Sequence, residues 1–256
     1  MGDKPREHGR NLLVWMEKIT KKFGTITALQ EVDFGVEGGE VRALLGDNGA
    51  GKSTLIKILM GVYPLTSGQV YLEGKPVRFA SPREARASGI EAVYQDLALV
   101  NLMSITRNFF LGREIVRGVG PVRWLDVHKM NEICRTSLRD IGIEIRSPTE
   151  RVGSLSGGER QSIAIGRGVH FGAKVLILDE PTSALSVAET RKVLTYIASA
   201  RDRGLAVIFI THNVHHVYMM ADSYTVIRQG KNVGTYYKGE LTEEDIADLI
   251  TGDREA

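Results

Sequence analysis

The sequence predicts an α/β fold, in which the strands of a parallel sheet alternate with helices. Residues 175–178 and Ala206–Ile210 are continuously apolar, which is typical of strands buried on both faces of a sheet. A third strand-like run, Val41–Leu45, leads into a glycine-rich segment and then a helix-like run over residues 53–60. Helical segments between such runs favour a sheet with crossover helices.

The N-terminal third is expected to be richer in strands. Strand patterns cover residues 12–19 and 25–36, and a basic turn over residues 21–24 joins them. The first helix is expected to end at Gly61. Residues 69–72 and 77–79 flank a Glu-Gly-Lys-Pro turn, which is a hairpin signal. Ser81 and Pro82 then predict the N-cap and first position of a short helix, and a strand follows at residues 90–94.

From about residue 97 to residue 154 the strand signals fade. Helices are expected at residues 104–111, 127–141 and 156–170, and we interpret this stretch as a helical insert in the α/β domain. Beyond the strand at residues 175–178, the patterns indicate a helix at 187–201, a strand at 224–228 and a turn at 229–232. A capping-box pattern from Thr242 to Asp245 predicts the start of a last helix.

The composition excludes several classes of protein. A net charge of +2 over 256 residues argues against a dedicated nucleic-acid binder. The single cysteine, Cys134, excludes an intrachain disulfide and a cysteine-built zinc site, and we expect it to be a buried helix residue in a reducing compartment. No apolar run reaches the length of about 18 residues that a membrane helix needs. The polar residues 1–11 do not resemble a signal peptide, so a cytosolic chain is expected, whose membrane role would come through a partner.

The glycine-rich segment matches the phosphate-binding pattern G-x-x-x-x-G-K-[ST]. Its glycines let the backbone approach phosphate oxygens, while the following helix N-terminus adds positive charge. The lysine would reach the β- and γ-phosphates of ATP, and the serine hydroxyl would coordinate Mg²⁺. The alternative is a glycine-rich strand–helix turn with no role in phosphate binding. The segment comprises Gly46, Asp47, Asn48, Gly49, Ala50, Gly51, Lys52, Ser53 and Thr54.

Two carboxylates, Asp179 and Glu180, follow the buried strand at residues 175–178. In open α/β sheets ligands bind outside the carboxyl ends of the strands. We therefore expect Asp179 to hold Mg²⁺, directly or through water, and Glu180 to orient or deprotonate the attacking water. The alternative is a pair of solvated carboxylates before the turn at Pro181.

A third motif lies at residues 155–161, Leu-Ser-Gly-Gly-Glu-Arg-Gln. Ser156 can cap a helix, and Gly157 and Gly158 allow another phosphate to approach its N-terminus. One ATP does not need two phosphate-binding helix termini from the same chain. An ATP held by a partner subunit would explain the second.

Together, the phosphate loop, this signature and the segment Val-Leu-Ile-Leu-Asp-Glu-Pro-Thr-Ser-Ala-Leu at residues 175–185 resemble the nucleotide-binding subunit of an ABC transporter. The resemblance covers residues 13–251. It implies a P-loop NTPase (RecA-like) core with an N-terminal antiparallel β subdomain and an inserted helical subdomain. It also implies two subunits that close head to tail over two ATP molecules. We expect a flexible lead-in at residues 1–11 and one nucleotide-binding domain at 12–256, with the helical insert at about 97–158.

The resemblance assigns roles to individual positions. Phe23, which in a basic turn is on its own more typical of a core side chain, matches the aromatic that stacks on adenine. Gln95 matches the loop glutamine that touches the metal and the water and senses the membrane partner. Glu180 matches the general base, and His212 matches the switch histidine that contacts the γ-phosphate. The signature residues that would bind the opposite subunit's ATP are Ser156, Gly157, Gly158 and Glu159.

Two features depart from the family pattern. Ser186 stands where the family usually has an aspartate that helps to organise the opposite active site, which puts communication between the two sites in doubt. Gly166 and Gly168 replace the usual alanines after the signature, at a cost of about 1 kcal/mol of helix propensity each. Nothing in the sequence explains these glycines.

Residues 94–97 and 101–114 and the tail at 239–252 resemble the ATP-binding subunits of bacterial monosaccharide importers. The resemblance implies a homodimer or a paired ABC subunit, an integral-membrane permease and, indirectly, a periplasmic sugar-binding protein. The subunit would lie at the cytoplasmic face of the inner membrane. Ribose, xylose, galactose and fructose are all possible sugars, because no residue of this chain is expected to read the sugar.

Other functions remain open at this point. The same ATPase subunit could power the transport of another cargo, such as an amino acid or a lipid. A soluble ABC ATPase acting on ribosomes or DNA is disfavoured, because only about a hundred residues separate Lys52 from Ser156 and the chain has no basic tail. Glu180 and His212 argue against a regulatory protein without turnover. The spacing of His212, His215 and His216 places them on one helix face and could suggest a metal cluster, but this is disfavoured because no carboxylate or thiol ligand lies nearby in the sequence.

Overall fold

The computed structural model describes residues 12–119 and 122–252 and divides into two compact units. The first unit contains the chain up to Ala92, Ala173–Glu180, and the chain from Arg201 onward. The second unit contains Val93–Gly172 and Pro181–Ala200. None of the helices in the described ranges is long and apolar enough to cross a membrane.

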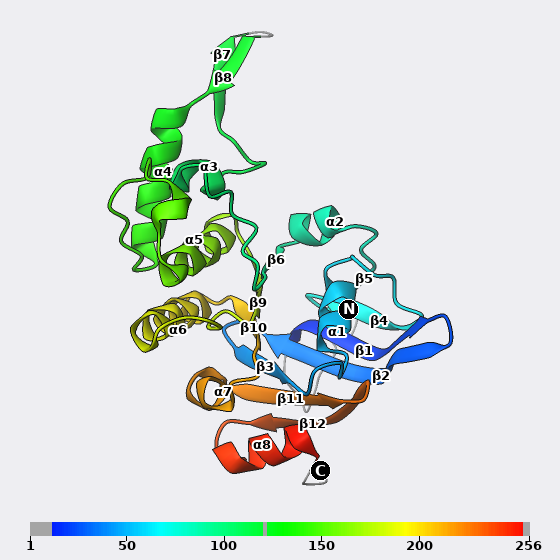
Figure 1. Cartoon of the computed structure of the whole chain (residues 1–256). Helices are drawn as coiled ribbons and strands as arrows, with labels where there is room; N and C mark the ends of the chain where they lie inside the picture. Colours follow the sequence, from blue (N-terminus) through cyan, green and yellow to red (C-terminus); the bar gives the residue numbers. More distant parts are fainter. Residues whose placement is uncertain (1–11, 120–121, 253–256) are drawn as a thin grey trace. The chain divides into compact units, whose positions relative to one another are not determined.

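The first unit contains two sheets (Figure 1). The four-stranded sheet has the order β2-β1-β4-β5 and is antiparallel throughout. Its strands are β1 (Leu12–Phe23), β2 (Ile26–Glu37), β4 (Ser67–Leu72) and β5 (Lys75–Val77). The predicted hairpin is present, but β5 begins at Lys75 and ends at Val77, so the turn is shorter than the expected Glu-Gly-Lys-Pro and the strand expected at 77–79 is misplaced. The two turn residues, Glu73 and Gly74, have φ 54° and 75°, the left-handed region that a tight hairpin turn requires.

The six-stranded sheet has the order β12-β11-β3-β10-β9-β6. Strands β11, β3, β10 and β9 run parallel, whereas β12 is antiparallel to β11. Because the central strands are parallel, their carboxyl ends meet at one edge. The strands are β3 (Val41–Leu45), β6 (Ile90–Val93), β9 (Val175–Asp179), β10 (Ala206–Ile210), β11 (Ser223–Arg228) and β12 (Lys231–Tyr237).

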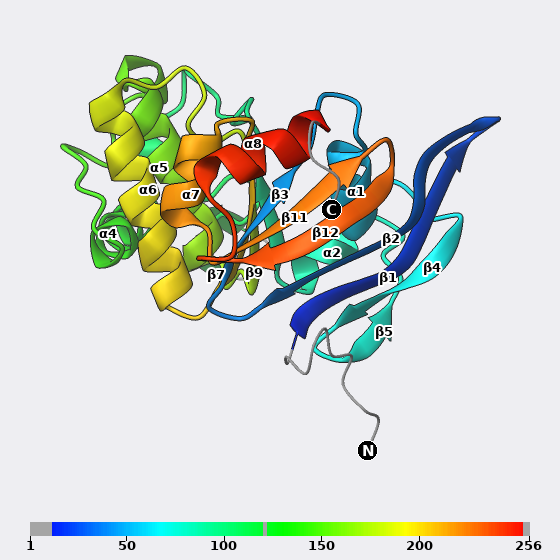
Figure 2. The same ribbon diagram turned by 90° about the horizontal axis from the view of Figure 1, so that it is seen from below.

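Two of the described helices of the first unit begin where the sequence places their caps. Ser81 caps α2 with Pro82 at its first position, and Thr242 and Asp245 form the predicted capping box of α8. Helix α8 contacts β11 and α7, as the view in Figure 2 shows. These helices are α1 (Lys52–Leu59), α2 (Pro82–Ala87), α7 (Val214–Met220) and α8 (Glu243–Thr251).

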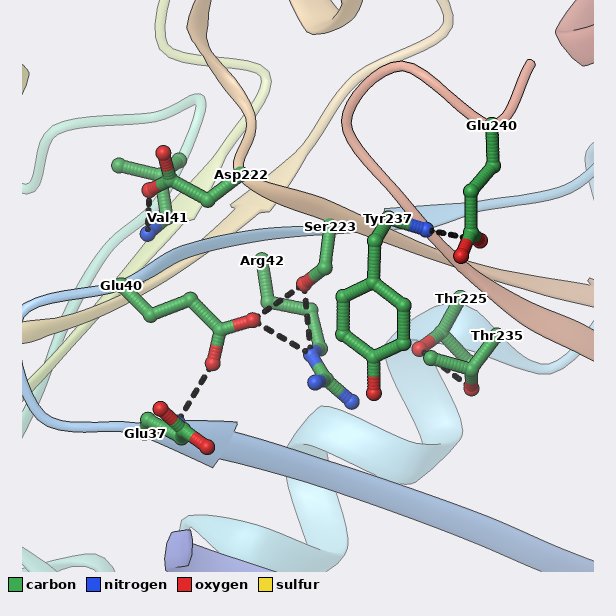
Figure 3. A network of polar contacts seen from close by, with 10 residues as sticks. All are labelled: Glu37, Glu40, Val41, Arg42, Asp222, Ser223, Thr225, Thr235, Tyr237 and Glu240. Carbon is green, nitrogen blue, oxygen red and sulfur yellow. Dashed lines mark hydrogen bonds and ion pairs between the residues drawn. The ribbon is translucent and has the colours of Figure 1, made fainter. Parts of the chain in front are cut away.

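A buried charged cluster holds β3 in place (Figure 3). Arg42 is fully buried, and its Nε lies 3.2 Å from Glu40 Oε1 and 2.9 Å from Ser223 Oγ on β11. Ser223 Oγ also donates a short hydrogen bond to Glu40 Oε1. A buried guanidinium is tolerated only when it is paired in this way. The cluster explains a cation inside a buried strand, and it fixes the strand that leads into the phosphate loop.

The second unit consists of helices and a hairpin. Its elements are α3 (Ile105–Phe109), α4 (Val127–Asp140), a 3₁₀ turn (Val152–Ser154), α5 (Gly157–His170), most of α6 (Val187–Asp202), β7 (Val116–Val119) and β8 (Val122–Leu125). Cys134 is buried on α4, as predicted, and burial raises the pKa of its thiol to about 12. Figure 1 shows the hairpin extending away from α3, α4 and α5.

The structure explains Gly166, for which the sequence offers no reason. A Cβ atom at this position of α5 would lie 2.4 Å from Leu138 Cδ2 and 3.1 Å from Ile141 Cδ1. Both of these side chains belong to the buried cluster of the second unit. Gly166 therefore lets α4 pack close against α5, and this packing offsets the lost helix propensity.

Three further expectations about secondary structure are wrong. The turn expected at residues 21–24 is shorter, because β1 continues to Phe23, which pairs with Ile26. The turn expected at 229–232 is also shorter, and β12 begins at Lys231. The stretch expected to be helical contains the β7–β8 hairpin, in which Gly118 adopts φ 155° close to Val122 O. Its β-branched residues around glycine and proline were the missed signal.

Candidate functional site

The phosphate loop connects β3 to α1, and its end glycines are required by close backbone contacts. Gly46 has φ 142°, and a Cβ there would lie 2.1 Å from Ile227 O. Gly51, the N-cap of α1, has φ 111°, and a Cβ there would lie 2.7 Å from Leu29 Cδ2. Any other residue at these positions would strain the backbone or collide with β2 and β11.

The tip of this loop is open and its base is anchored. Asp47, Asn48 and Gly49 are exposed, whereas Ala50 is buried and its carbonyl accepts a hydrogen bond of 2.9 Å from Gly230 N. Ser53 is exposed on the first turn of α1, so its hydroxyl is available to a metal or phosphate. The loop therefore presents backbone groups and a hydroxyl to solvent, as an anion site needs.

The Lys52 side chain folds back over the loop. Its Nζ donates to Gly46 O at 2.5 Å and to Asp47 O at 3.0 Å. Burial lowers the pKa of Lys52, while the nearby charges of Glu180 and Asp179 oppose this effect. The ammonium group is thus held among acceptors at the loop, where an incoming phosphate would be a stronger partner than neutral carbonyls.

Asp179 lies at the end of β9, beside the phosphate loop. Ile210 pairs with Asp179 on one side and with Leu44 on the other, which brings the ends of β9, β10 and β3 to one edge. Burial raises the pKa of Asp179, and the neighbouring Glu180 raises it further. A carboxylate and the Ser53 hydroxyl are the hard oxygen donors that Mg²⁺ prefers, so these two residues fit such an ion.

Glu180 is held by the two residues that directly follow β10, the strand that pairs with β9. Its Oε2 accepts a hydrogen bond of 3.1 Å from Thr211 Oγ1, and its Oε1 accepts one of 3.0 Å from His212 N. The same Oε1 lies 2.8 Å from His212 Nδ1. Glu180 itself adopts φ 52°, a left-handed conformation that is uncommon for a side chain of this size. The sequence did not single out Thr211, although it directly follows a buried strand.

Phe23 is an accessible aromatic at the end of β1. Its side chain is 42% exposed, so the interpretation of Phe23 as a core residue is wrong. Its ring meets Tyr63 edge-on with centroids 5.2 Å apart, and Lys21 Nζ lies 4.7 Å from its centroid. The neighbouring Lys21 is the buried residue of this segment, and its Nζ donates to Pro64 O at 2.7 Å.

The signature lies in the second unit, at the start of α5. Ser156 is the N-cap, its Oγ accepts from Glu159 N at 3.2 Å, and Ser156 N donates to Glu159 Oε2 at 2.8 Å. Gly158 N donates to Glu189 Oε1 on α6 at 3.2 Å, and a Cβ at Gly157 would lie 2.9 Å from Leu185 Cδ2. Because these glycines carry no side chain, other residues can approach the start of α5 closely, and its N–H groups are accessible to acceptors.

The sequence analysis missed Glu189 as a residue that contacts the signature. Ser186 and Glu189 have the Ser-x-x-Glu spacing of a capping box, and this signal could have revealed the contact. Glu189 N donates to Ser186 Oγ at 3.3 Å, and Ser186 Oγ donates to Glu189 Oε2 at 2.8 Å, so the residue that departs from the family pattern caps α6.

Gln95 is exposed and belongs to the second unit, whereas Ser53 and Asp179 belong to the first. It lines a cavity of about 320 Å³ in the second unit together with Asp96, Arg160 and Gln161. The phosphate loop, Asp179, Glu180 and His212 therefore belong to the first unit, and Gln95 and the signature belong to the second.

The histidines do not share a helix face as a metal site would need. His212 precedes α7, whose N-cap is Asn213, while His215 and His216 lie within that helix. His215 Nδ1 lies 3.3 Å from Glu243 Oε2 on α8. His212 is instead paired with Glu180, so the helical premise of the metal alternative is wrong.

Comparison with known proteins adds to this geometry. The family model of the ABC transporter matches residues 29–183, which is more than half of the chain. The chain belongs to the ABC transporter family. Both the expected ABC cassette fold and the resemblance to sugar-import subunits are confirmed.

Several relatives of this ABC ATPase bear names of sugar importers. The fructose import ATP-binding protein of Rhizobium meliloti is 43% identical over 93% of this chain and 93% of its own length. The xylose/arabinose import ATP-binding protein of Sulfolobus acidocaldarius is 43% identical over 93% of this chain and 94% of its own. The ribose import ATP-binding protein of Shouchella clausii is 36% identical over 94% of this chain and 48% of its own.

Solved structures agree on the fold. The ADP conformation of an ATP-binding cassette of an ABC transporter has a TM-score of 0.79, is 25% identical, and is matched over 94% of this chain and 95% of its own. A nucleotide-free cassette from an ABC transporter gives a TM-score of 0.80 at 24% identity, with the same coverage of both chains. The ABC cassette thus accounts for both units of the chain.

Proposed function

We propose that this chain is the ATP-hydrolysing subunit of a bacterial ABC importer for a monosaccharide of the fructose, ribose, xylose or galactose type. The observation that carries the proposal is the pairing of Glu180 with His212 beside an intact phosphate loop. The chain spans nearly the full length of the fructose and xylose/arabinose relatives. Their names support a sugar as cargo, and no feature of the described residues favours another cargo.

ATP would bind with its phosphates in the loop at residues 46–54 and its adenine on Phe23. Lys52 would exchange its contacts with Gly46 and Asp47 for phosphate oxygens. Ser53, Asp179 and Gln95 would hold Mg²⁺, which neutralises charge that develops on the phosphates. The exposed ring of Phe23 on β1 and the loop before α1 belong to the same unit.

Hydrolysis needs an acceptor for the proton of the attacking water. Glu180 would be that acceptor, because Thr211 and the His212 backbone hold its carboxylate in one orientation. His212 is largely exposed, with 79% of its side chain accessible, so its ring can turn from Glu180 toward a γ-phosphate.

A second copy or a paired ABC subunit would complete each site. The N–H groups at the start of α5, with Ser156, Gly157, Gly158 and Glu159, would bind the γ-phosphate held by the partner. Closure of the two subunits over two ATP molecules would then drive the permease. The chain would act at the cytoplasmic face of the inner membrane, and a periplasmic sugar-binding protein would choose the sugar.

The test measures the ATPase activity of the chain together with candidate permeases and binding proteins. The chain would be co-expressed with sugar permeases and their binding proteins, and ATPase activity would be measured with fructose, ribose, xylose, galactose, an amino acid or no solute. We expect stimulation by one sugar with its binding protein and permease. Stimulation by the amino acid instead would establish another cargo, and salt-sensitive binding of DNA or RNA by the chain alone would favour a soluble ABC ATPase.

A further inference from the structure

Glu189 joins the N-terminal ends of two helices in the second unit. Its Oε2 accepts hydrogen bonds from Ser186 N at 3.0 Å and Ser186 Oγ at 2.8 Å, at the start of α6. Its Oε1 accepts a hydrogen bond of 3.2 Å from Gly158 N, at the start of α5. One carboxylate therefore serves both helix ends, with a different oxygen on each.

This carboxylate is held in its ionised form. Hydrogen bonds from the side chains of Ser186 and Ser156, and from the backbone of Ser186 and Gly158, lower the pKa of Glu189 to about 2. The approach is close because residue 158 is a glycine, and a Cβ there would lie 2.8 Å from Glu189 Cβ. At neutral pH a full negative charge thus occupies the positive end of α5.

The donor that Glu189 engages on α5 is one that the proposed function assigns to the partner's ATP. The Gly158 N–H would bind the incoming γ-phosphate, which is also an anion. Both anions cannot use the same N–H group fully, and their charges repel each other at this range. Glu159, whose Oε2 is already on Ser156 N, adds a second carboxylate at the same helix end.

We propose that Glu189 is an internal competitor for the γ-phosphate of the partner's ATP and sets the ATP concentration at which two subunits close. This inference rests on the proposed function, because it needs the signature to bind nucleotide in trans. It makes Glu189 a positioning residue, which acts on closure through Gly158 and touches neither the reacting phosphate nor the water.

A phosphate could displace Glu189 from Gly158 without disturbing Ser186, because the two carboxylate oxygens have different partners. Displacement of Oε1 would break only the longer contact with Gly158, and Oε2 would keep both contacts with Ser186. Helix α6 would therefore stay capped while α5 takes up the phosphate. A cavity of about 280 Å³ adjoins both helix starts, and its lining includes the cationic side chains of Arg146 and Lys192.

The test measures ATP-driven dimerisation in a background that binds ATP without turnover. The mass in solution of Glu180→Gln would be followed during titration with Mg-ATP and compared with the double variant Glu180→Gln/Glu189→Gln. Glutamine keeps the shape of the cap at α6 but removes the charge. We expect the double variant to need about fivefold less ATP for half-maximal dimerisation, since a charge-assisted hydrogen bond no longer competes.

Two control variants in the same background separate this effect from others. Ser186→Ala loosens the cap of α6 but keeps the carboxylate on Gly158, and Glu244→Gln removes an exposed carboxylate on α8. Neither should lower the ATP requirement. An equal drop with either variant, or an unchanged or higher requirement with Glu189→Gln, would overturn the proposal.

A second measurement distinguishes this proposal from the proposed function. The affinity of the monomer for a fluorescent ATP analogue, measured at low protein concentration, should be the same with and without Glu189→Gln. A change there would overturn the competitor role, because Glu189 would be acting on the subunit's own nucleotide. If Glu180→Gln binds ATP but never dimerises, the two-subunit site fails and this inference fails with it. Dimerisation with an unaltered threshold rejects the inference alone.

Discussion

The carboxylate of Glu180 and the ring of His212 are in direct contact in this structure, with Oε1 2.8 Å from Nδ1. The His212 backbone N–H donates to the same oxygen, so the residue that follows β10 orients the residue that follows β9. Glu180 is partly shielded, with 18% of its side chain exposed, whereas the histidine ring is open to solvent. A fixed carboxylate beside an exposed imidazole is suited to a base and a ligand sensor, respectively.

Replacement of Glu180 by glutamine should separate binding from turnover. Glu180→Gln keeps the size of the side chain but cannot accept a proton, so we expect the ATPase rate to fall by about 100-fold or more. Affinity for Mg-ATP should remain close to that of the wild type. Phosphate release and binding of a fluorescent ATP analogue measure the two effects, and wild-type turnover by this variant would exclude Glu180 as the base.

Lys52→Ala should remove the cation from the phosphate loop. A triphosphate would lose a charge-assisted hydrogen bond, and we expect its affinity to fall by about 10- to 100-fold. Lys75→Ala, which removes an exposed lysine on β5, is the matched control. Isothermal titration with ATP compares the variants, and equal affinities would refute the phosphate-loop assignment.

Asp179 should make the cassette less stable at neutral pH. Burial and Glu180 raise its pKa in the folded state, so its charged form is disfavoured relative to the unfolded chain. Stability linked to this group is therefore present at acidic pH and lost as the pH rises through the folded-state pKa. We expect Asp179→Asn to raise the Tm by about 2 °C at pH 7, with a smaller gain as the pH falls.

Thermal unfolding without nucleotide, from pH 7 downward, measures this dependence. Asp47→Asn on the exposed loop tip is the control for a general change of charge. A gain for Asp179→Asn that grows on acidification would contradict the assigned direction of the pKa shift.

The Arg42–Glu40 pair should be essential for stability. Glu40→Gln removes the charge that compensates a fully buried guanidinium, and we expect a loss of about 3 kcal/mol in the free energy of unfolding. Replacing both residues by methionine should recover most of that loss. Lys174→Met, which removes an exposed ion pair with Glu73, should change stability by about 0.5 kcal/mol or less. Urea unfolding of the four proteins tests whether burial sets the difference.

Gly166→Ala should destabilise the second unit despite the better helix propensity of alanine. The new methyl group would lie 2.4 Å from Leu138 Cδ2, and such overpacking typically costs about 1–3 kcal/mol. Leu138→Ala combined with Gly166→Ala should be less harmful than the sum of the two single changes. Additive losses in a urea-unfolding cycle would show that the two positions do not compete for space.

Local sequence patterns were enough to predict the strand–loop–helix order around the phosphate loop, the buried strand before Asp179 and the caps at Ser81, Ser156 and Thr242. These features depend on residues a few positions apart, whose backbone preferences and apolar spacing are local properties. The two-subunit site and the roles of Gln95 and the signature stay predictions.

Contacts between residues far apart in the chain could not be predicted from the sequence and are seen in the folded chain. Glu180 and His212 are 32 positions apart, and Arg42 and Ser223 are 181 apart. Such pairs depend on the order and register of strands in the sheet, which no local pattern specifies. The same holds for Gly166, which is needed because side chains of a neighbouring helix occupy the space that a Cβ would fill. It also holds for Glu189, whose capping pattern is local but whose contact with Gly158 depends on packing between two helices.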